Sequence, residues 1–177
     1  MKQRGTTNIL YKYDGSNNIT NRYTQNLVVD DPLALQTNEQ TYYYLKDALG
    51  TVVAITDVNG NIVQNYTYDS YGNIHGQTGY ISQPFTFTGR EYDDETGLYF
   101  YRARMYDAKI GRFISKDPIS FAGGDVNLFR MVLNNPVNWI DPTGLAAYMC
   151  TKPLDALGGV GQWVYQYGNL YIISIFV

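Results

Sequence analysis

A repeated pattern of tyrosines, an aspartate and a glycine constrains the fold of this chain more than any other feature. Its clearest copy, residues 66–74, reads YTYDSYGNI: an alternating Tyr-rich stretch, then Asp-x-x-Gly, then a polar and an aliphatic residue. Asp47, Asp57 and Asp69 follow one another at intervals of 10 and 12 residues. Turn signals at this spacing, between alternating stretches, are typical of consecutive antiparallel hairpins. Further copies of varying completeness lie at residues 11–14, 47–52, 57–62, 94–98 and 106–113.

Each part of the repeat has a function in such a hairpin. An Asp side chain can accept hydrogen bonds from the backbone of its own turn, and Gly adopts the positive φ of a tight reversal. Between turns the side chains alternate, so Tyr66 and Tyr68 share one face. In residues 98–106 the same alternation is expected to place Tyr101 on one face and Arg104 on the other. The spacing alone fits both an ordinary β-meander and a repeat array of stacked hairpins.

Composition favours β-structure and argues against several kinds of site. The chain has 18 Tyr and 17 Gly, while charged residues make up only 16%. Its net charge of −3 provides no basic surface for nucleic acid, so no nucleic-acid partner is predicted. His75 is the only histidine and Cys150 the only cysteine, which excludes an internal disulfide and a Cys-based zinc site. No metal site and no cofactor is predicted.

The ends of the chain carry no targeting or membrane signal that the sequence reveals. The first eight residues, MKQRGTTN, have positive charge but no apolar run behind it, so no signal peptide is predicted in this chain. The longest apolar stretch, residues 171–177, is far shorter than the roughly 20 residues that cross a bilayer. By itself it fits either a β-strand or an aggregation-prone tail, and no membrane span is predicted.

Several stretches resemble a known family. Residues 66–74 look like the YD repeat of Rhs (rearrangement hotspot) proteins and of the insecticidal toxin-complex C proteins. Residues 87–104, FTGREYDDETGLYFYRAR, are similar to the opening of the Rhs repeat-associated core segment. Residues 111–119 and 134–145 resemble its closing part. The close resemblance covers about residues 84–145, and a looser repeat match begins at about residue 42.

The resemblance implies a fold and a task. Members of this family wind many YD hairpins into a hollow β-shell that encloses a C-terminal toxic domain, and their core segment plugs one end. An intrinsic aspartyl protease activity then cuts the shell from its cargo, directly after the second Asp-Pro-x-Gly-Leu. We therefore expect an all-β chain of antiparallel YD hairpins that forms the plug end of a shell, with one short helix and a short C-terminal tail.

Four segments are expected along the chain. Residues 1–41 are irregular YD-like strands, expected as one or two strands and loose loop, and residues 42–83 are YD repeats. Residues 84–145 are the core segment, and residues 146–177 are a variable tail, a vestigial or truncated cargo read as a linker followed by a β-hairpin. The short helix is expected at residues 125–133, with Asp125 as its N-cap.

Two aspartates are the candidate catalytic residues. The resemblance assigns Asp117 and Asp141, from the paired Asp-Pro motifs, and places the cut between Leu145 and Ala146. Two carboxylates beside a peptide bond can hydrolyse it when one is ionised and activates water while the other supplies a proton. Because substrate and catalyst are one chain, proximity supplies much of the rate.

Three further residues are assigned supporting roles, and one departs from the family pattern. Arg112 and Lys116 carry charges that could keep a carboxylate ionised, and Gly144 completes the second motif. Taken alone, Asp-Pro is a common turn opener, and the two cations equally fit a solvated strand edge. Ser120 stands where the family usually has Gly. If that position needs positive φ, Ser costs about 1 kcal/mol there and could displace Asp117.

Two function classes stay open. The first is a shell segment with a self-cleaving site, whose partners are the remainder of a YD-repeat shell or a C-terminal toxin cargo, with a secretion-system spike or an immunity protein. That reading implies a secreted or cell-surface location after export by a specialised system. The second is a non-enzymatic β-repeat module, a truncated orphan reading frame that binds a partner or surface through its Tyr-rich sheet. In both readings Arg90, Arg102 and Arg104 are structural partners of nearby carboxylates.

Overall fold

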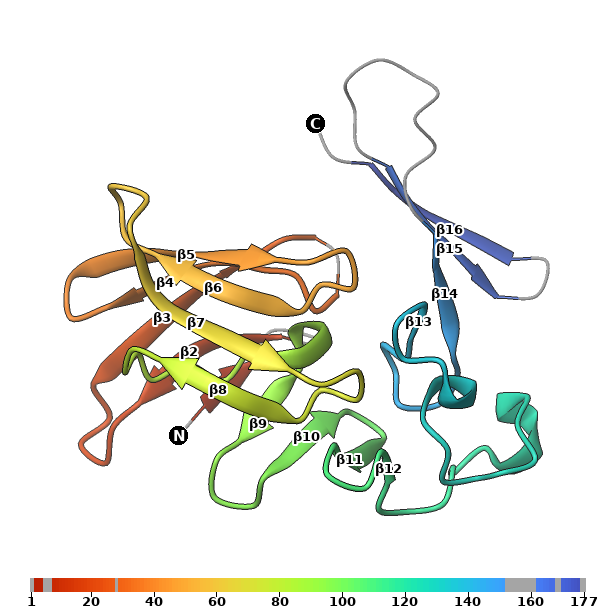
Figure 1. The fold of residues 1–177 in the computed structure, drawn as a ribbon. Helices are drawn as coiled ribbons and strands as arrows, with labels where there is room; N and C mark the ends of the chain where they lie inside the picture. Colours follow the sequence, from red (N-terminus) through yellow and green to blue (C-terminus); the bar gives the residue numbers. More distant parts are fainter. Residues whose placement is uncertain (1, 5–7, 28, 152–161, 168–169, 176–177) are drawn as a thin grey trace. The chain divides into compact units, whose positions relative to one another are not determined.

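The computed structural model describes residues 2–4, 8–27, 29–151, 162–167 and 170–175. It divides the chain into two compact units, Met1–Asp69 with Ile74–Arg90, and Ser70–Asn73 with Glu91–Val177. Both units are built from antiparallel sheet, which confirms the expected all-β fold (Figure 1). No helix among the described residues is long and apolar enough to cross a membrane.

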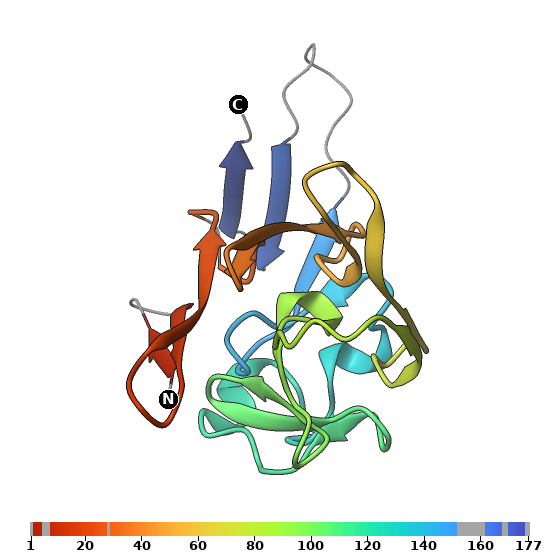
Figure 2. The same ribbon diagram turned by 90° about the vertical axis from the view of Figure 1, so that its left-hand side faces the viewer.

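One eight-stranded sheet makes up most of the first unit. Its strands pair in chain order, each antiparallel to its neighbour, as the spacing of the turns predicts (Figures 1 and 2). They are β1 (Lys2–Arg4), β2 (Ile9–Tyr13), β3 (Ile19–Gln25), β4 (Pro32–Thr37), β5 (Gln40–Lys46), β6 (Val52–Thr56), β7 (Ile62–Tyr68) and β8 (Ile74–Thr78).

The aspartates of the repeat close the turns of this sheet. Asp57 Oδ1 accepts the backbone N–H groups of Asn59 and Asn61 at 2.8 and 2.9 Å, and Gly60 has φ +83°. The side-chain amide of Asn61 also donates to Asp57 and lowers the pKa of that carboxyl below its ordinary value. Asp14 and Asp47 accept backbone N–H groups in the same i+2 and i+4 pattern. The repeat is therefore a series of side-chain-capped hairpin turns.

Inward-facing rings form the core of the first unit. Tyr23 and Tyr44 are buried against Phe85, whose ring lies edge-on to theirs at centroid distances of 5.3 and 6.1 Å. Phe85 comes from residues 79–90, which pack against this face of the sheet. A Cβ at Gly79 would lie 2.2 Å from a backbone carbonyl oxygen of β7, so this close approach requires glycine.

The expectation of one or two strands and loose loop before residue 42 is wrong. Strands β1 to β4 lie there, in the same ladder as the later hairpins. Their alternation is hard to read because Asn21, a polar residue, occupies an inward position of β3. Asn21 is buried, and its amide donates to the backbone carbonyl of Ser82 at 3.0 Å, which compensates for the loss of water.

The second unit contains two four-stranded antiparallel sheets. One has the order β12-β11-β10-β9 and the other the order β13-β14-β15-β16. Strands β15 and β16 form the hairpin expected in the C-terminal tail, while residues 152–161, which precede this hairpin, lie outside the described residues. The strands are β9 (Glu91–Asp93), β10 (Leu98–Tyr101), β11 (Arg104–Asp107), β12 (Arg112–Phe113), β13 (Trp139–Ile140), β14 (Tyr148–Thr151), β15 (Gln162–Tyr167) and β16 (Leu170–Ile175).

A cluster of aromatic rings forms the core of the second unit. Tyr101, Tyr106 and Phe113 are buried, with ring centroids 5.5 to 5.7 Å apart and planes tilted at 66 to 83°. The hydroxyl of Tyr106 donates to the backbone carbonyl of Tyr71 at 2.7 Å, which ties the YD turn at residues 70–73 to this unit. The cluster gives β10, β11 and β12 a rigid base.

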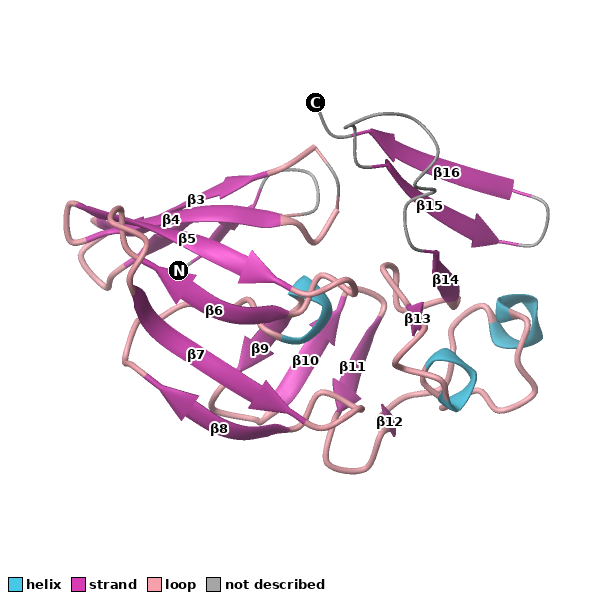
Figure 3. Ribbon diagram, turned by 45° about the horizontal axis from the view of Figure 1, so that its top comes forward, coloured by secondary structure: helices cyan, strands magenta, loops and turns pink. Residues whose placement is uncertain are grey.

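The helix expected at residues 125–133 is not formed. Helical geometry in the described chain is limited to the 3-10 turns Phe87–Gly89, Ser120–Gly123 and Val132–Asn134 (Figure 3). The carbonyls of Leu128 and Phe129 accept the N–H groups of Asp117 and Phe113, both at 2.9 Å, so they bond outside their own segment. Asp125 caps a turn by accepting the N–H of Asn127 at 2.8 Å, as an N-cap would, but an irregular loop follows.

Candidate active site

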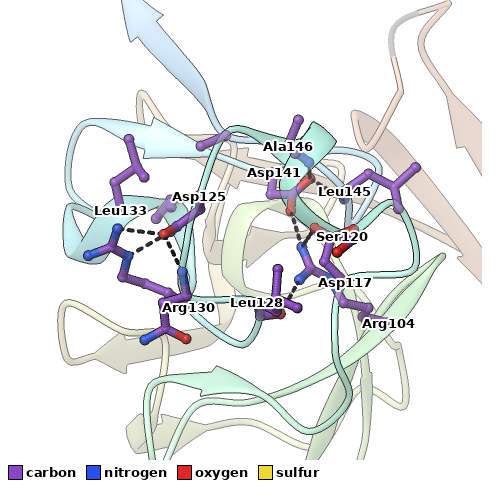
Figure 4. Close-up of a pocket in the computed structure, with 14 residues that line it drawn as sticks. Arg104, Asp117, Ser120, Asp125, Leu128, Arg130, Leu133, Asp141, Leu145 and Ala146 are labelled. Atoms are coloured by element: carbon purple, nitrogen blue, oxygen red, sulfur yellow. Dashed lines mark hydrogen bonds and ion pairs between the residues drawn. The ribbon is translucent and has the colours of Figure 1, made fainter.

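Both predicted catalytic aspartates lie beside one arginine. Arg104 Nη2 is 3.1 Å from Asp117 Oδ2 and 3.3 Å from Asp141 Oδ2 (Figure 4). The three side chains are only 4%, 8% and 3% exposed, respectively. The aspartates are 24 residues apart in the sequence, and the loop between them returns to bring them together. The geometry is thus that of two carboxylates in a shared, largely water-excluded environment.

Arg104 is held in place by two backbone carbonyls and one aromatic ring in addition to the two aspartates. Its Nε donates to the carbonyl of Gly144 at 2.6 Å, and its Nη1 donates to the carbonyl of Leu128 at 3.1 Å. Its guanidinium carbon lies 3.6 Å from the centroid of the Phe113 ring. Burial lowers the pKa of Arg104, and Asp117 and Asp141 act in the opposite direction. An arginine remains charged under such conditions, so the group supplies one positive charge to two carboxyls.

Asp117 begins a short turn that follows β12. Its backbone N–H donates to the carbonyl of Leu128 at 2.9 Å, the same carbonyl that Arg104 binds. Its Oδ1 accepts the N–H of Ile119 at 3.0 Å, and its carbonyl accepts the N–H of Ser120 at 3.0 Å. The Asp-Pro turn is therefore real, and it also directs Oδ2 towards Arg104.

Asp141 directly follows β13 and organises the chain that comes after it. Its Oδ1 accepts the backbone N–H groups of four consecutive residues at 2.8 to 3.2 Å. These residues are Thr143, Gly144, Leu145 and Ala146. An oxygen that accepts so many N–H groups is best satisfied in the carboxylate form. The predicted leaving nitrogen, Ala146 N, is 3.2 Å from this oxygen.

The predicted scissile bond lies in the same pocket as the two aspartates. A Cβ at Gly123 would lie 2.8 Å from the carbonyl oxygen of Leu145 and 3.0 Å from Asp117 Oδ2. Glycine at this position thus allows the Leu145 carbonyl and the Asp117 carboxylate to approach the same point. Asp141 contacts the nitrogen side of the bond to Ala146, and Asp117 lies on the carbonyl side. Both residues of the bond line a pocket that also contains both aspartates (Figure 4).

The structure places the three predicted supporting residues differently. Gly144 has φ +71°, and a Cβ there would lie 2.1 Å from the carbonyl oxygen of Tyr101, so only glycine fits. Arg112 and Lys116 are exposed, and neither is among the residues that line the pocket. The cation that the candidate site uses is Arg104, which the sequence pattern placed on the face opposite Tyr101 as a structural partner of carboxylates.

A second ion pair fixes the loop opposite the aspartates. Arg130 binds Asp125 with both Nε and Nη2 at 2.6 Å, and these bonds hold the pKa of Asp125 below its ordinary value (Figure 4). The pair closes residues 125–130 around Leu128, whose carbonyl binds both Arg104 and Asp117. No group of three or more His, Cys, Asp or Glu side chains that could hold a metal ion occurs in the described part of the chain.

Backbone strain lies next to Asp117. Ser120 has φ +54°, which lies in the left-handed region. This conformation is unfavourable for a residue with a Cβ, so serine is strained at a position where the family usually has glycine. Val132 and Leu133, which also line the pocket, have φ +37° and +55°. A β-branched residue is rare in this region, so Val132 is a second strained position. Strain at these residues is expected to disfavour the ordered site.

Replacing Ser120 by Gly is expected to stabilise the protein by up to about 1 kcal/mol, because Gly tolerates positive φ. Ser120→Ala retains a Cβ and hence the strain, so it should give no gain. Urea unfolding of the three proteins measures the difference. If the Gly and Ala variants are equally stable, the strain at this position is negligible.

The chain is similar to large toxin proteins. It is 36% identical over 143 residues to the tRNA(Glu)-specific nuclease WapA of Bacillus subtilis subsp. natto, which covers 77% of this chain and 6% of that protein. It is 34% identical over 103 residues to the toxin protein Tse5 of Pseudomonas aeruginosa, covering 58% of this chain and 8% of that protein. The chain thus spans less than a tenth of either relative's length.

A solved structure and a family match agree with these relatives. The structure of TcdB2-TccC3-TEV superposes with a TM-score of 0.63 at 25% identity, covering 80% of this chain and 7% of that one. The family described as the teneurin YD-shell matches residues 17–137, more than half of the chain. The repeated hairpins, the capped YD turns and these matches together show that the chain belongs to the YD-shell family of Rhs/YD-repeat proteins.

Proposed function

We propose that this chain is the end segment of a β-shell that encapsulates and delivers a C-terminal toxin, and that it cuts its own backbone between Leu145 and Ala146. The observation that carries the proposal is the placement of this bond. Asp141 Oδ1 is 3.2 Å from Ala146 N, and Asp117 shares Arg104 with Asp141 while approaching the carbonyl of Leu145.

The mechanism follows from these positions. With one proton between the two carboxyls, Asp141 takes a proton from a water molecule as the water oxygen attacks the carbonyl carbon of Leu145. Asp117, on the carbonyl side, donates a proton to the carbonyl oxygen. The tetrahedral intermediate then collapses: Asp117 takes back a proton from one of its two hydroxyls, the C–N bond breaks, and Asp141 returns its proton to the nitrogen of Ala146. The positive charge of Arg104 offsets the negative charge of the pair throughout.

The relatives support the shell part of the proposal. WapA is a tRNA nuclease and Tse5 is a toxin protein, and both share with this chain only a small part of their length. A common shell segment joined to different cargos would produce this pattern. In this view residues 84–145 are the core segment and residues 146–177 belong to the cargo side, preceded by YD-like strands at 1–41 and YD repeats at 42–83. The partners are then further shell repeats, a toxin cargo, a secretion-system spike or an immunity protein, and the location is secreted or on the cell surface.

Mass spectrometry of the purified chain tests self-cleavage. We expect fragments 1–145 and 146–177 to accumulate slowly, because of the strain at Ser120, at a rate independent of protein concentration. Ser120→Gly should accelerate the reaction. An intact chain in both proteins would contradict self-cleavage and favour the non-enzymatic interaction module.

A further inference from the structure

The backbone before the proposed cut is bound on its carbonyl side as well as on its N–H side. Three consecutive carbonyls, those of Pro142, Thr143 and Gly144, accept hydrogen bonds from three consecutive residues of the hairpin between β10 and β11. Arg102 Nη1 donates to Pro142, Ala103 N to Thr143 at 3.3 Å, and Arg104 Nε to Gly144 at 2.6 Å. Each of the three hairpin residues thus binds one residue of the segment, and both sets run in the same direction along the chain.

Local structure shows how this hairpin presents its donors. Tyr101 pairs with Arg104 across the hairpin, which leaves Arg102 and Ala103 as a two-residue turn. Arg102 has φ +60°, and Ala103 is exposed. The backbone N–H of Ala103 does not bond within the hairpin but donates to the carbonyl of Thr143. The missing side chain of Gly144 allows the bound segment to touch Tyr101 and Arg104 directly.

We propose that residues 102–104 form a carbonyl clamp that holds residues 142–144 and thereby sets which peptide bond is cut. The inference rests on the proposed self-cleavage and adds its specificity determinant. All three contacts of the clamp are made to backbone oxygens, so apart from the need for glycine at position 144 the clamp fixes the number of residues and not their side chains. Leu145 is the next residue after the clamped segment, and the bond that follows it, to Ala146, lies in the pocket with both aspartates. Arg102 donates to a backbone carbonyl of the bound segment, so its part in the clamp is that of a positioning residue.

Insertion of a residue tests whether the position of the cut is set by its distance from the clamp or by the side chains on either side of the bond. One Gly inserted between Gly144 and Leu145, in the Ser120→Gly protein, should move the cut to the bond after the inserted residue. Intact-mass measurement of the two fragments identifies the bond. A cut that remains between Leu145 and Ala146 would overturn the clamp, because the enzyme would then recognise side chains.

Substitution of Arg102 tests the clamp at its outer contact. Arg102→Met keeps the length of the side chain without a donor, and we expect cutting about tenfold slower with minor products at neighbouring bonds. Arg102→Lys retains a donor and should recover most of the rate and the single cut position. A structural role alone would lower the yield without adding new cut positions, and that result contradicts the proposal.

Amide hydrogen exchange tests the clamp even if no cutting occurs. In the uncut chain the Ala103 N–H, bound to Thr143, should exchange several-fold faster in Arg102→Met than in the parent protein. The Phe113 N–H, bound to Phe129 in the same unit, is the internal control and should not change. Unchanged protection of Ala103 overturns the clamp. Absence of cutting with altered protection would instead refute only the proposed self-cleavage.

Discussion

Asp141→Asn and Asp117→Asn are each expected to slow cutting of the Leu145–Ala146 bond by about 10²–10⁴-fold, the usual contribution of a general acid or base. Asn retains the shape of Asp, so its carbonyl oxygen can still accept the N–H groups that Asp141 binds. Asp141→Asn removes the group proposed to activate water, and Asp117→Asn removes the group proposed to protonate the carbonyl oxygen, so neither aspartate is expected to replace the other. The rate of appearance of fragment 1–145 in the Ser120→Gly protein is the measurement.

Asp107→Asn is the matched control for these variants. Asp107 also caps a turn in the second unit, by accepting the N–H of Lys109 at 2.9 Å, but it does not line the pocket. It should cut at the parent rate. Efficient cutting in the Asp117→Asn, Asp141→Asn double variant would show that an outside protease makes the cut. Equal slowing by Asp107→Asn would show that the effect is a general loss of turn stability.

Local sequence was sufficient to predict the hairpins, whereas the two candidate aspartates came from the family resemblance. Each YD turn contains its own capping group and its own glycine, as Asp57 and Gly60 show, so hairpin formation depends little on distant contacts. The aspartates were found because their Asp-Pro motifs stand in a recognisable family segment. The structure then brings them together through Arg104, a contact across 13 and 37 residues that no local pattern encodes.

Arg104 was assigned to the wrong face for a specific reason. The alternation was extended from β10 through residues 102 and 103 as if one strand continued to Tyr106. These residues instead reverse the chain, and the pairing of Tyr101 with Arg104 places both on the buried face. The turn lacks the Gly or Asn that usually marks a two-residue hairpin. In the structure, the left-handed conformation of Arg102, with φ +60°, marks the reversal.

The missing helix reflects tertiary contacts in the same way. Asp125 is a good N-cap, and residues 126–133 contain no glycine or proline, so local propensity favours a helix there. Two of its carbonyls bind Asp117 and Phe113 instead. Left-handed conformations at Val132 and Leu133 then end any helical continuation. Hydrogen bonds to Asp117 and Phe113 therefore replace the hydrogen bonds that these carbonyls would accept within a helix, and one of them holds the backbone of Asp117.

Removal of the shared cation is expected to have the largest effect on stability. Arg104→Met removes the cation that the buried Asp117 and Asp141 share, and loss of one member of a buried ionic group typically costs about 3–5 kcal/mol. Methionine fills a similar volume against Phe113, so loss of packing contributes little. Unfolding in guanidinium chloride at neutral pH measures the loss.

The dependence on pH identifies the cause of that loss. Protonation removes the uncompensated charge of a buried carboxylate, so the difference in stability between Arg104→Met and the parent should shrink as the pH falls from neutral into the acid range. Arg130→Met is the control: the pair of Arg130 with Asp125 is more exposed, at 29% and 17%, so its loss should destabilise the protein much less than the loss of Arg104. Adding Asp117→Asn to Arg104→Met should recover part of the stability, because one buried charge is then absent. A loss that is constant with pH and unaffected by Asp117→Asn would mean that Arg104 stabilises the unit by packing and not by charge.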